Sequence, residues 1–231
     1  MSTAVIHQPD FLSWLGFFHR LLHADVYIAL DCVQFVSRTS RSWTHRDKIK
    51  TPRGEKWLTL GVRRAPLGTQ IRRIELSDAA DWRAANLSLL RENYRGAAHF
   101  DAIYTRIEAL YAMPCTLLAD FNLASIRLLL ELFAIDIPIR LASELEPAGA
   151  SNERLVDILV KAGAGCYLSG LGARDYFRAE PFAAAGIEVR WQEFRHPVYP
   201  QLHGDFIPFL SSIDMLFNCG IERSRDILRS C

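Results

Sequence analysis

The sequence lacks long hydrophobic runs, a disulfide pattern and a basic leader, and each absence excludes a class of protein. The longest apolar stretch, residues 126–135, is interrupted by Arg127 and Glu131 and is shorter than the roughly 18–20 residues that cross a bilayer. The five cysteines are odd in number and have no CxxC spacing, which favours reduced thiols over a disulfide framework or a zinc site. Because the first residues carry no basic segment, we expect no signal peptide and a cytoplasmic protein.

The short motifs of several enzyme classes are absent too. The chain has no HExxH zinc motif, no GxSxG nucleophile elbow, no GxGxxG dinucleotide loop and no Walker A sequence. His19 and His23 stand at the i, i+4 spacing of a helical metal site, but such a pair is more often two ordinary histidines, so we expect no metal. Half of the 231 residues are hydrophobic and 23% are charged, a composition that can bury a core and excludes a disordered chain.

Charge is distributed unevenly along the chain. Between residues 37 and 74, eleven cations stand against one Asp and one Glu, a net charge of +9, and since the whole chain carries +1 the remainder carries −8. The cations are Arg38, Arg41, Arg46, Lys48, Lys50, Arg53, Lys56, Arg63, Arg64, Arg72 and Arg73. This asymmetry indicates a local anion site for nucleotide phosphates, a diphosphate-linked carrier or RNA, or else a solvated ribbon that keeps the protein soluble.

Apolar periodicity predicts alternating strands and helices at both ends of the chain. Strands are expected at residues 3–6, 26–30, 137–141, 166–169 and 187–191, with helices at 14–23, 153–162, 173–185 and 211–219. Strands separated by helices of this length pair in parallel. We therefore expect an α/β fold with three layers and a mostly parallel, Rossmann-like sheet.

The middle of the chain has a different pattern. The turn signal TPRGE and a strand at 56–62 predict an antiparallel β-hairpin, with a further strand at 71–76. Helices at 81–94, 98–111 and 116–134 predict a bundle. We expect a single α/β domain over residues 1–231 that carries a basic β-ribbon at about 37–76 and a helical insertion at about 77–135.

The turn after the first strand is the first candidate site, because open parallel sheets bind ligands beyond the carboxyl ends of their strands. His7 at the strand end is suited to acid–base chemistry or phosphate contact, and Gln8 and Pro9 follow it. The helix that begins at Trp14 offers free N–H groups to an anion, and Gly16 would let a ligand approach closely. His7 bonded to a carbonyl and Gly16 packed on the sheet are the structural alternatives.

Polar residues also follow two other predicted strands. Asp31 is suited to bind a ribose hydroxyl, an amine or a metal, although loop aspartates more commonly cap a turn. Cys32 is a conceivable nucleophile, but no feature of the sequence indicates a lowered pKa. Ser169 and Gly170 lie in a strand–turn–helix segment suited to a phosphate or carboxylate, with Arg174 as a charged clamp.

Two further segments supply candidate binding residues. Arg46 and Lys48 are two apart on a predicted strand, so they share a face and are placed to grip one anion together. Tyr199 and Gln201 lie in a rigid, polar loop after His196. We expect His7, Trp14, Asp31, Arg46 and Ser169 to converge on one crevice at the carboxyl edge of the sheet.

Taken together, these segments resemble the WbqC-like family. The N-terminal part follows its pattern in Ile6-His7-Gln8-Pro9, Trp14-Leu15-Gly16-Phe17-Phe18, Asp25-Val26-Tyr27, Leu30-Asp31, Val33-Gln34-Phe35 and Trp43 with Arg46, Ile49 and Lys50. The C-terminal part follows it in Tyr167-Leu168-Ser169-Gly170, Tyr199-Pro200-Gln201 and Leu216-Phe217-Asn218-Cys219-Gly220. Cys32 stands where the pattern has a second Asp, and His45 and Asp47 replace two Asn around Arg46.

The resemblance implies a role in pathways for O-antigen, other surface polysaccharides or specialised metabolites, with a glycine or amino-acid transferase activity proposed for some members. The first turn also resembles a degenerate HIGH-type nucleotidyltransferase signature in which Trp14 and Phe17 replace the two histidines. That likeness implies a nucleotidyltransferase-like fold. The cofactor stays open, with ATP or an already activated acyl donor as the candidates.

We therefore expect an acyl or aminoacyl transferase, or an adenylate-forming amide ligase, that forms an amide on an amino-sugar or similar small amine. His7 would be the base or a phosphate contact, Asp31 would bind the amine, and Arg46 with Lys48 would bind the anionic donor, with Gln34 nearby. One alternative is a nucleotide- or RNA-binding module without catalysis, which uses the basic ribbon and its tryptophans. Another is a structural partner in a biosynthetic complex.

Overall fold

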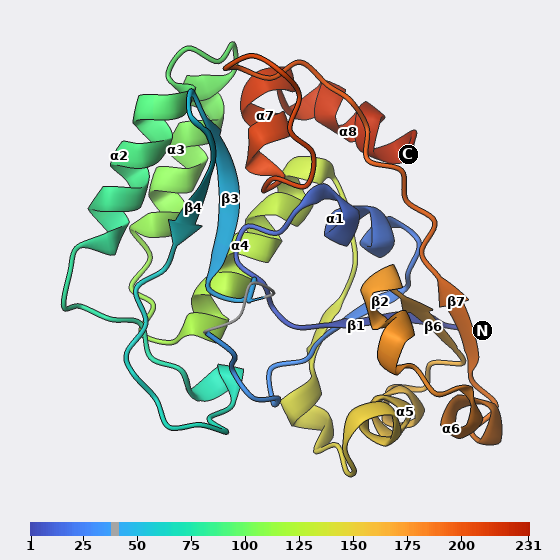
Figure 1. Cartoon of the computed structure of the whole chain (residues 1–231). Coiled ribbons are helices and arrows are strands. Elements are labelled where there is room, and N and C mark those ends of the chain that lie inside the picture. The colour runs from blue at the N-terminus through green and yellow to red at the C-terminus, as the bar shows by residue number, and fades with distance from the viewer. Residues whose placement is uncertain (38–41) are drawn as a thin grey trace.

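The computed structural model describes residues 1–37 and 42–231, so Arg38 and Arg41 of the basic window lie outside the described residues. Five parallel strands form one sheet in the order β5-β2-β1-β6-β7, and β3 and β4 form a separate antiparallel hairpin (Figure 1). The strands are β1 Thr3–His7, β2 Val26–Ala29, β3 Arg46–Thr51, β4 Gly54–Thr59, β5 Ile139–Leu141, β6 Cys166–Ser169 and β7 Glu188–Trp191. The predicted α/β fold with a parallel, Rossmann-like sheet is confirmed.

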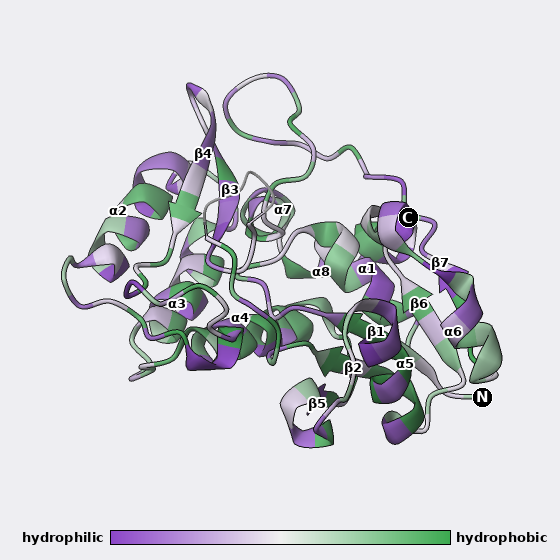
Figure 2. Ribbon diagram, turned by 60° about the horizontal axis from the view of Figure 1, so that its bottom comes forward, coloured by the Kyte–Doolittle hydropathy of each residue, from purple (hydrophilic) through white to green (hydrophobic). Residues whose placement is uncertain are grey.

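The sheet is the middle of three layers. Successive side chains of its strands point to opposite faces, so each face presents apolar residues that helices cover. In β1, Ala4 and Ile6 join one apolar core while Val5 joins the other. The first core is covered by α5 (Ser151–Ala162) and α6 (Ala179–Ala184), and the second by α1 (Leu15–Leu22) and α8 (Ile221–Arg229) (Figure 1). Burial on both faces explains why the middle of β1 and the whole of β2 are made of apolar and aromatic residues, and β2 is mostly green in Figure 2.

A helical bundle lies beside the sheet and supports the hairpin. It consists of α2 (Trp82–Tyr94), α3 (Phe100–Tyr111) and α4 (Leu118–Phe133), close to the predicted ranges. Asp81 begins α2 by accepting a hydrogen bond from the N–H of Ala84 at 2.9 Å, which satisfies one donor of the first turn. The short helix α7 (Ile213–Cys219) packs on α3 and connects the bundle to α8.

The predicted strand at 71–76 is wrong. Ile71–Arg73 forms a 3₁₀ turn, η1, in which the N–H of Ile74 donates to the carbonyl of Ile71 at 3.1 Å. The i, i+3 spacing of Ile71 and Ile74 places both side chains in the core. A strand would have pointed these two side chains to opposite faces.

The prediction of one continuous helix at 173–185 is wrong. It is divided into η3 (Leu171–Tyr176) and α6, with Phe177 and Arg178 in extended conformation between them. Pro181 has no N–H to donate to the carbonyl of Phe177, so a helix through this point would lose a hydrogen bond. The apolar pattern does not predict α8, because this helix has few apolar residues and they stand among charged ones.

Within the described ranges, no helix has the length and apolar character needed to cross a membrane. The five cysteines are free thiols.

Candidate functional site

The candidate site lies where the order of strands in the sheet changes direction. From β1 the chain adds β2 and β5 on one side and later β6 and β7 on the other, so the topological switch point lies between β1 and β6. The register pairs Ala4 with Tyr167, and continued to the strand ends it sets His7 level with Gly170. The structure thus places His7, Ser169 and Gly170 at one carboxyl edge, where open α/β sheets bind ligands.

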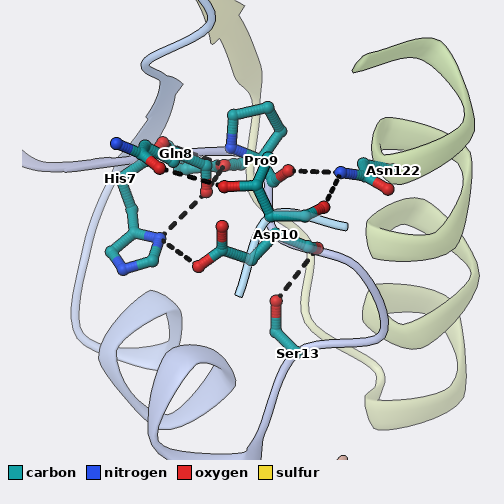
Figure 3. A network of polar contacts seen from close by, with 8 residues as sticks. His7, Gln8, Pro9, Asp10, Ser13 and Asn122 are labelled. Atoms are coloured by element: carbon teal, nitrogen blue, oxygen red, sulfur yellow. Dashed lines mark hydrogen bonds and ion pairs between the residues drawn. The ribbon is translucent and has the colours of Figure 1, made fainter. Parts of the chain in front are cut away.

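His7 is held as a neutral imidazole at the end of β1. Its Nδ1 lies 2.9 Å from the carbonyl oxygen of Gln8 and 3.7 Å from Oδ2 of Asp10 (Figure 3). Since a carbonyl only accepts hydrogen bonds, Nδ1 carries the proton and Nε2 keeps its lone pair. Burial against the ring of Phe17, together with the charge of Arg20, lowers the pKa of His7 to about 3. His7 therefore offers a neutral polar group, not a cation, to any ligand.

Asp10 is a buried carboxyl group that sequence reasoning passed over. Its side chain is 13% exposed, and its Oδ1 is buried without a hydrogen-bond partner in the part of the chain that the structure describes. Burial raises the pKa of Asp10 to about 7, although Thr44 and Arg20 oppose the shift. The available signal was its place in the first strand–helix turn, three residues after His7.

Arg20 on α1 is a second residue that sequence reasoning missed. The residue is 6% exposed, its Nε is buried without a hydrogen bond, and among the described residues its guanidinium has no carboxylate at ion-pair distance. A Cβ at Gly170 would lie 2.5 Å from the Nη1 atom of Arg20, so the glycine lets the guanidinium lie against the end of β6, and a larger residue would displace it. The hydroxyl of Ser169, next to this glycine, is also buried and unpartnered in the described structure.

The loop after β1 is held in place by residues from two distant elements. Asn122 on α4 is fully buried and donates hydrogen bonds to the carbonyls of Pro9 at 2.7 Å and Thr44 at 2.6 Å (Figure 3). The hydroxyl of Thr44 donates to Oε1 of Gln8 at 3.0 Å. The helical bundle and the segment before β3 therefore position the loop that carries His7 and Asp10.

Asp47 brings a second carboxyl group toward Asp10. It is 2% exposed and accepts the N–H of Lys48 at 2.6 Å. Burial raises the pKa of Asp47 well above its usual range, and the charge of Asp10 adds to this effect. The carboxyl edge thus holds two buried carboxyl groups, and Asp10 is the one that titrates near neutrality.

Asp31 ends β2 at the same edge but has a structural use. Its two carboxylate oxygens accept hydrogen bonds from the N–H of Ser143 at 2.9 Å and from the Ser143 hydroxyl at 2.6 Å. These bonds cap the 3₁₀ turn η2 (Ala142–Leu145). Burial and the charge of Asp31 raise the pKa of the Cys32 thiol, which keeps it protonated and makes it a poor nucleophile. An amine-binding role for Asp31 stays a prediction.

The space beside Gly16 is filled by the protein itself. A Cβ at Gly16 would lie 2.2 Å from the indole ring of Trp14, which folds over this position. The same ring packs against Phe194 and Phe209, with centroid distances of 5.4 and 5.6 Å. Gly16 therefore has a packing role, and its contact is the Trp14 ring, not the sheet of the structural alternative.

Arg46 and Lys48 share a face of β3, but that face is turned away from the one that carries Asp47. The guanidinium of Arg46 lies 4.2 Å above the ring of Trp57, and Lys48 forms an ion pair with Glu55. The structure therefore does not bring these two cations together with His7.

Tyr199 and Gln201 contribute to a buried network. The Tyr199 hydroxyl and the Gln201 amide donate to Oδ1 of Asp214 at 3.0 and 2.9 Å, and the hydroxyl of Tyr94 donates to its Oδ2 at 2.7 Å. Asp214 is fully buried, so these bonds hold the segment before α7 against the bundle.

The remaining predicted binding residues lie outside this cluster. Arg174 is exposed on η3, 5.1 Å above the ring of Trp191. Gln34 is exposed and forms an isolated bridge with Gln70.

A surface hollow of about 640 Å³ lies elsewhere, along residues 75–78, 80–83 and 115–117. Its polar groups have partners: Arg63 pairs with Glu75 and Asp78, and Arg83 donates to the carbonyl of Tyr111 at 2.6 Å. We place the site at the carboxyl edge because unpartnered buried polar atoms gather there.

Comparisons with known proteins identify the family of this chain. The WbqC-like protein family matches residues 8–226. An uncharacterized protein of Mycobacterium tuberculosis is 34% identical over 235 residues, which cover 100% of this chain and 99% of the relative. No solved structure matches the chain. With a match across nearly its whole length, the chain belongs to the WbqC-like protein family.

Proposed function

We propose that the protein is an acyl or aminoacyl transferase that forms an amide on a small amine such as an amino-sugar. The observation that carries this proposal is Asp10, a buried carboxyl with a pKa of about 7 beside neutral His7 and beside Arg20, whose Nε has no partner among the described residues. A general base works best when its pKa lies near the working pH, and Asp10 meets this condition better than His7.

In the proposed reaction, the amine nitrogen attacks the carbonyl carbon of the acyl donor. The carboxylate of Asp10 takes the proton that the nitrogen loses, and the leaving group departs from the carbonyl carbon with the bonding electron pair. The same carboxyl group can then return the proton to the leaving group. A group with a pKa of about 7 is present in both forms at neutral pH, so it suits both transfers.

The neighbouring side chains have distinct parts in this scheme. His7 presents Nε2 as a hydrogen-bond acceptor for the amine, because Nδ1 is committed to the Gln8 carbonyl. Arg20 supplies the positive charge for the anionic part of the donor, a task assigned in the sequence to Arg46 and Lys48. The scheme fits an activated donor with an anionic leaving group, and an adenylate made from ATP is one such donor.

A two-stage experiment tests the proposal. A thermal-shift screen of ATP, coenzyme A thioesters, aminoacyl donors and nucleotide sugars identifies the donor, since a ligand at 100 times its dissociation constant stabilises by about 2.7 kcal/mol. Mass spectrometry then measures amide formation on amino-sugars by wild type, Asp10→Asn and the surface control Asp136→Asn. We expect Asp10→Asn to lose about 10²–10⁴-fold in rate with donor binding retained. Wild-type rates in Asp10→Asn would contradict the assigned base.

A second candidate, a nucleotide- or RNA-binding module, is favoured by one observation. Trp43 and Trp57 lie 5.2 Å apart between ring centroids, half-buried on the face that carries Arg46 and Lys48. Binding of a single-stranded oligonucleotide that weakens steeply with salt and is lost in Trp57→Ala, without amide formation from any donor, would support this function instead.

A further inference from the structure

Arg20 carries a charge that the described structure does not neutralise. A buried guanidinium without an ion pair or hydrogen bonds is costly, and buried charges in proteins are normally paired. Burial lowers the pKa of Arg20, and the nearby charges of Tyr167, Tyr27 and Asp10 oppose this shift without an ion pair between Arg20 and Asp10 among the described residues. The Nε of Arg20 and the Oδ1 of Asp10 are both buried and unpartnered among the described residues. An anionic ligand at this point would compensate the charge of the guanidinium.

The end of β6 supplies a second donor. The hydroxyl of Ser169 is buried and forms no hydrogen bond of normal geometry among the described residues, although it lies close enough to the Tyr167 hydroxyl to act on it as a weak donor. Burial raises the pKa of Tyr167, and Ser169 and the charge of Arg20 both lower it, so both donors lie near this side chain. Gly170, between Ser169 and η3, lets the guanidinium lie against the backbone, since a Cβ would meet it at 2.5 Å. Both donors therefore belong to the same side of the switch point.

We propose that Arg20 and Ser169 bind a phosphoryl group at the switch point between β1 and β6. The guanidinium offers two terminal nitrogens in a fork and the serine offers a hydroxyl, so the donors match the three free oxygens of a phosphoryl group better than the two of a carboxylate. This inference rests on the proposed function in one respect. It takes the phosphoryl group to be the anionic part of the acyl donor.

Inorganic phosphate is the probe that tests the site directly. Thermal melting and calorimetric titration are carried out at constant ionic strength with wild type, Arg20→Met, Arg20→Lys, Ser169→Ala and Arg95→Met. Arg95→Met is the matched control, because it removes the same charge from an exposed position at the end of α2. We expect Arg20→Met to lose phosphate affinity by about tenfold or more and Ser169→Ala to lose it several-fold, as for charge-assisted hydrogen bonds. Arg95→Met should bind as wild type does.

Phosphate-free melting supplies an independent readout. Arg20→Met removes an uncompensated buried charge while keeping a long apolar side chain, so its melting temperature should equal or exceed that of wild type. If the melting temperature falls far below that of wild type or the variant does not fold, Ser169→Ala and Arg20→Lys decide the question, and wild-type phosphate affinity in both would overturn the proposal. Acetate binding as tight as phosphate binding would also overturn the phosphoryl assignment.

The two proposals fail in different ways. Phosphate binding that depends on Arg20, without amide formation from any donor, would keep the anion site and remove the proposed function. Amide formation by Arg20→Met at the wild-type rate and donor affinity would keep the function and remove the anion site.

Discussion

Replacing Asp10 by Asn should change how the stability of the protein depends on pH. The pKa of Asp10 rises from 3.8 to about 7 on folding, so between these values the folded state binds more protons than the unfolded state. Stability from this group is then fully present below about pH 3.8 and is lost as pH rises through about 7. The difference between the two pKa values, converted at about 1.4 kcal/mol per pH unit, corresponds to a loss of roughly 4 kcal/mol in the free energy of unfolding above neutral pH. A side chain only 13% exposed justifies this conversion.

Asn resembles the protonated acid in shape and has no charge to desolvate. The free energy of unfolding of Asp10→Asn, relative to wild type, should therefore stay constant near pH 4 and increase by up to about 4 kcal/mol between pH 4 and 8. Urea denaturation at each pH measures this difference, with Asp136→Asn on the surface as the control that should follow wild type. Parallel pH profiles for wild type and Asp10→Asn would refute a raised pKa and, with it, the general base.

Three further substitutions probe the surroundings of the site. Gly16→Ala should cost about 1–3 kcal/mol of stability because the new methyl group overpacks against the Trp14 ring. In a double-mutant cycle measured by urea denaturation, most of this cost should disappear when the same substitution is made in Trp14→Ala. Tyr199→Phe should cost about 1–3 kcal/mol because it leaves buried Asp214 with one donor fewer, whereas an unchanged urea midpoint would contradict the network. Arg46→Ala should cost about 0.5–2 kcal/mol from its stack on an indole and leave donor affinity unchanged; a loss of donor binding in calorimetry would return Arg46 to the site.

The elements with strong local patterns were predictable from the sequence. The β1 and β2 strands are continuous apolar runs, and the TPRGE turn separates β3 from β4, so their existence follows from neighbouring residues alone. One error occurred where tertiary contacts outweigh local pattern, since a 3₁₀ turn buries both Ile71 and Ile74. The other missed a local signal, because Pro181 cannot donate the hydrogen bond that a helix continuing through Phe177 needs.

The location of the candidate site could be predicted from the sequence, but most of the charged residues that lie there could not. Parallel strands separated by helices imply a switch point, and that implication places His7 and Ser169 at one edge. The charged residues there were not predictable. In the sequence, Arg20 looks like an ordinary polar residue of an apolar helix, and Asp10 looks like an ordinary aspartate of a loop. Nothing local distinguishes them from Arg46 or Asp31, which the structure uses for stacking and capping.

The sequence by itself determined the fold class, most of the strands and helices and the sheet edge at which His7 and Ser169 lie. These follow from the period of apolar residues, which neighbouring residues encode. The tertiary structure alone decided which polar groups have partners. Asp31 meets Ser143 across 112 residues, and Asn122 holds a loop 113 residues away, while among the described residues Nε of Arg20 and Oδ1 of Asp10 are buried without such partners. Desolvation depends on everything packed around a group, so the charges that define the site emerge only when the chain is folded.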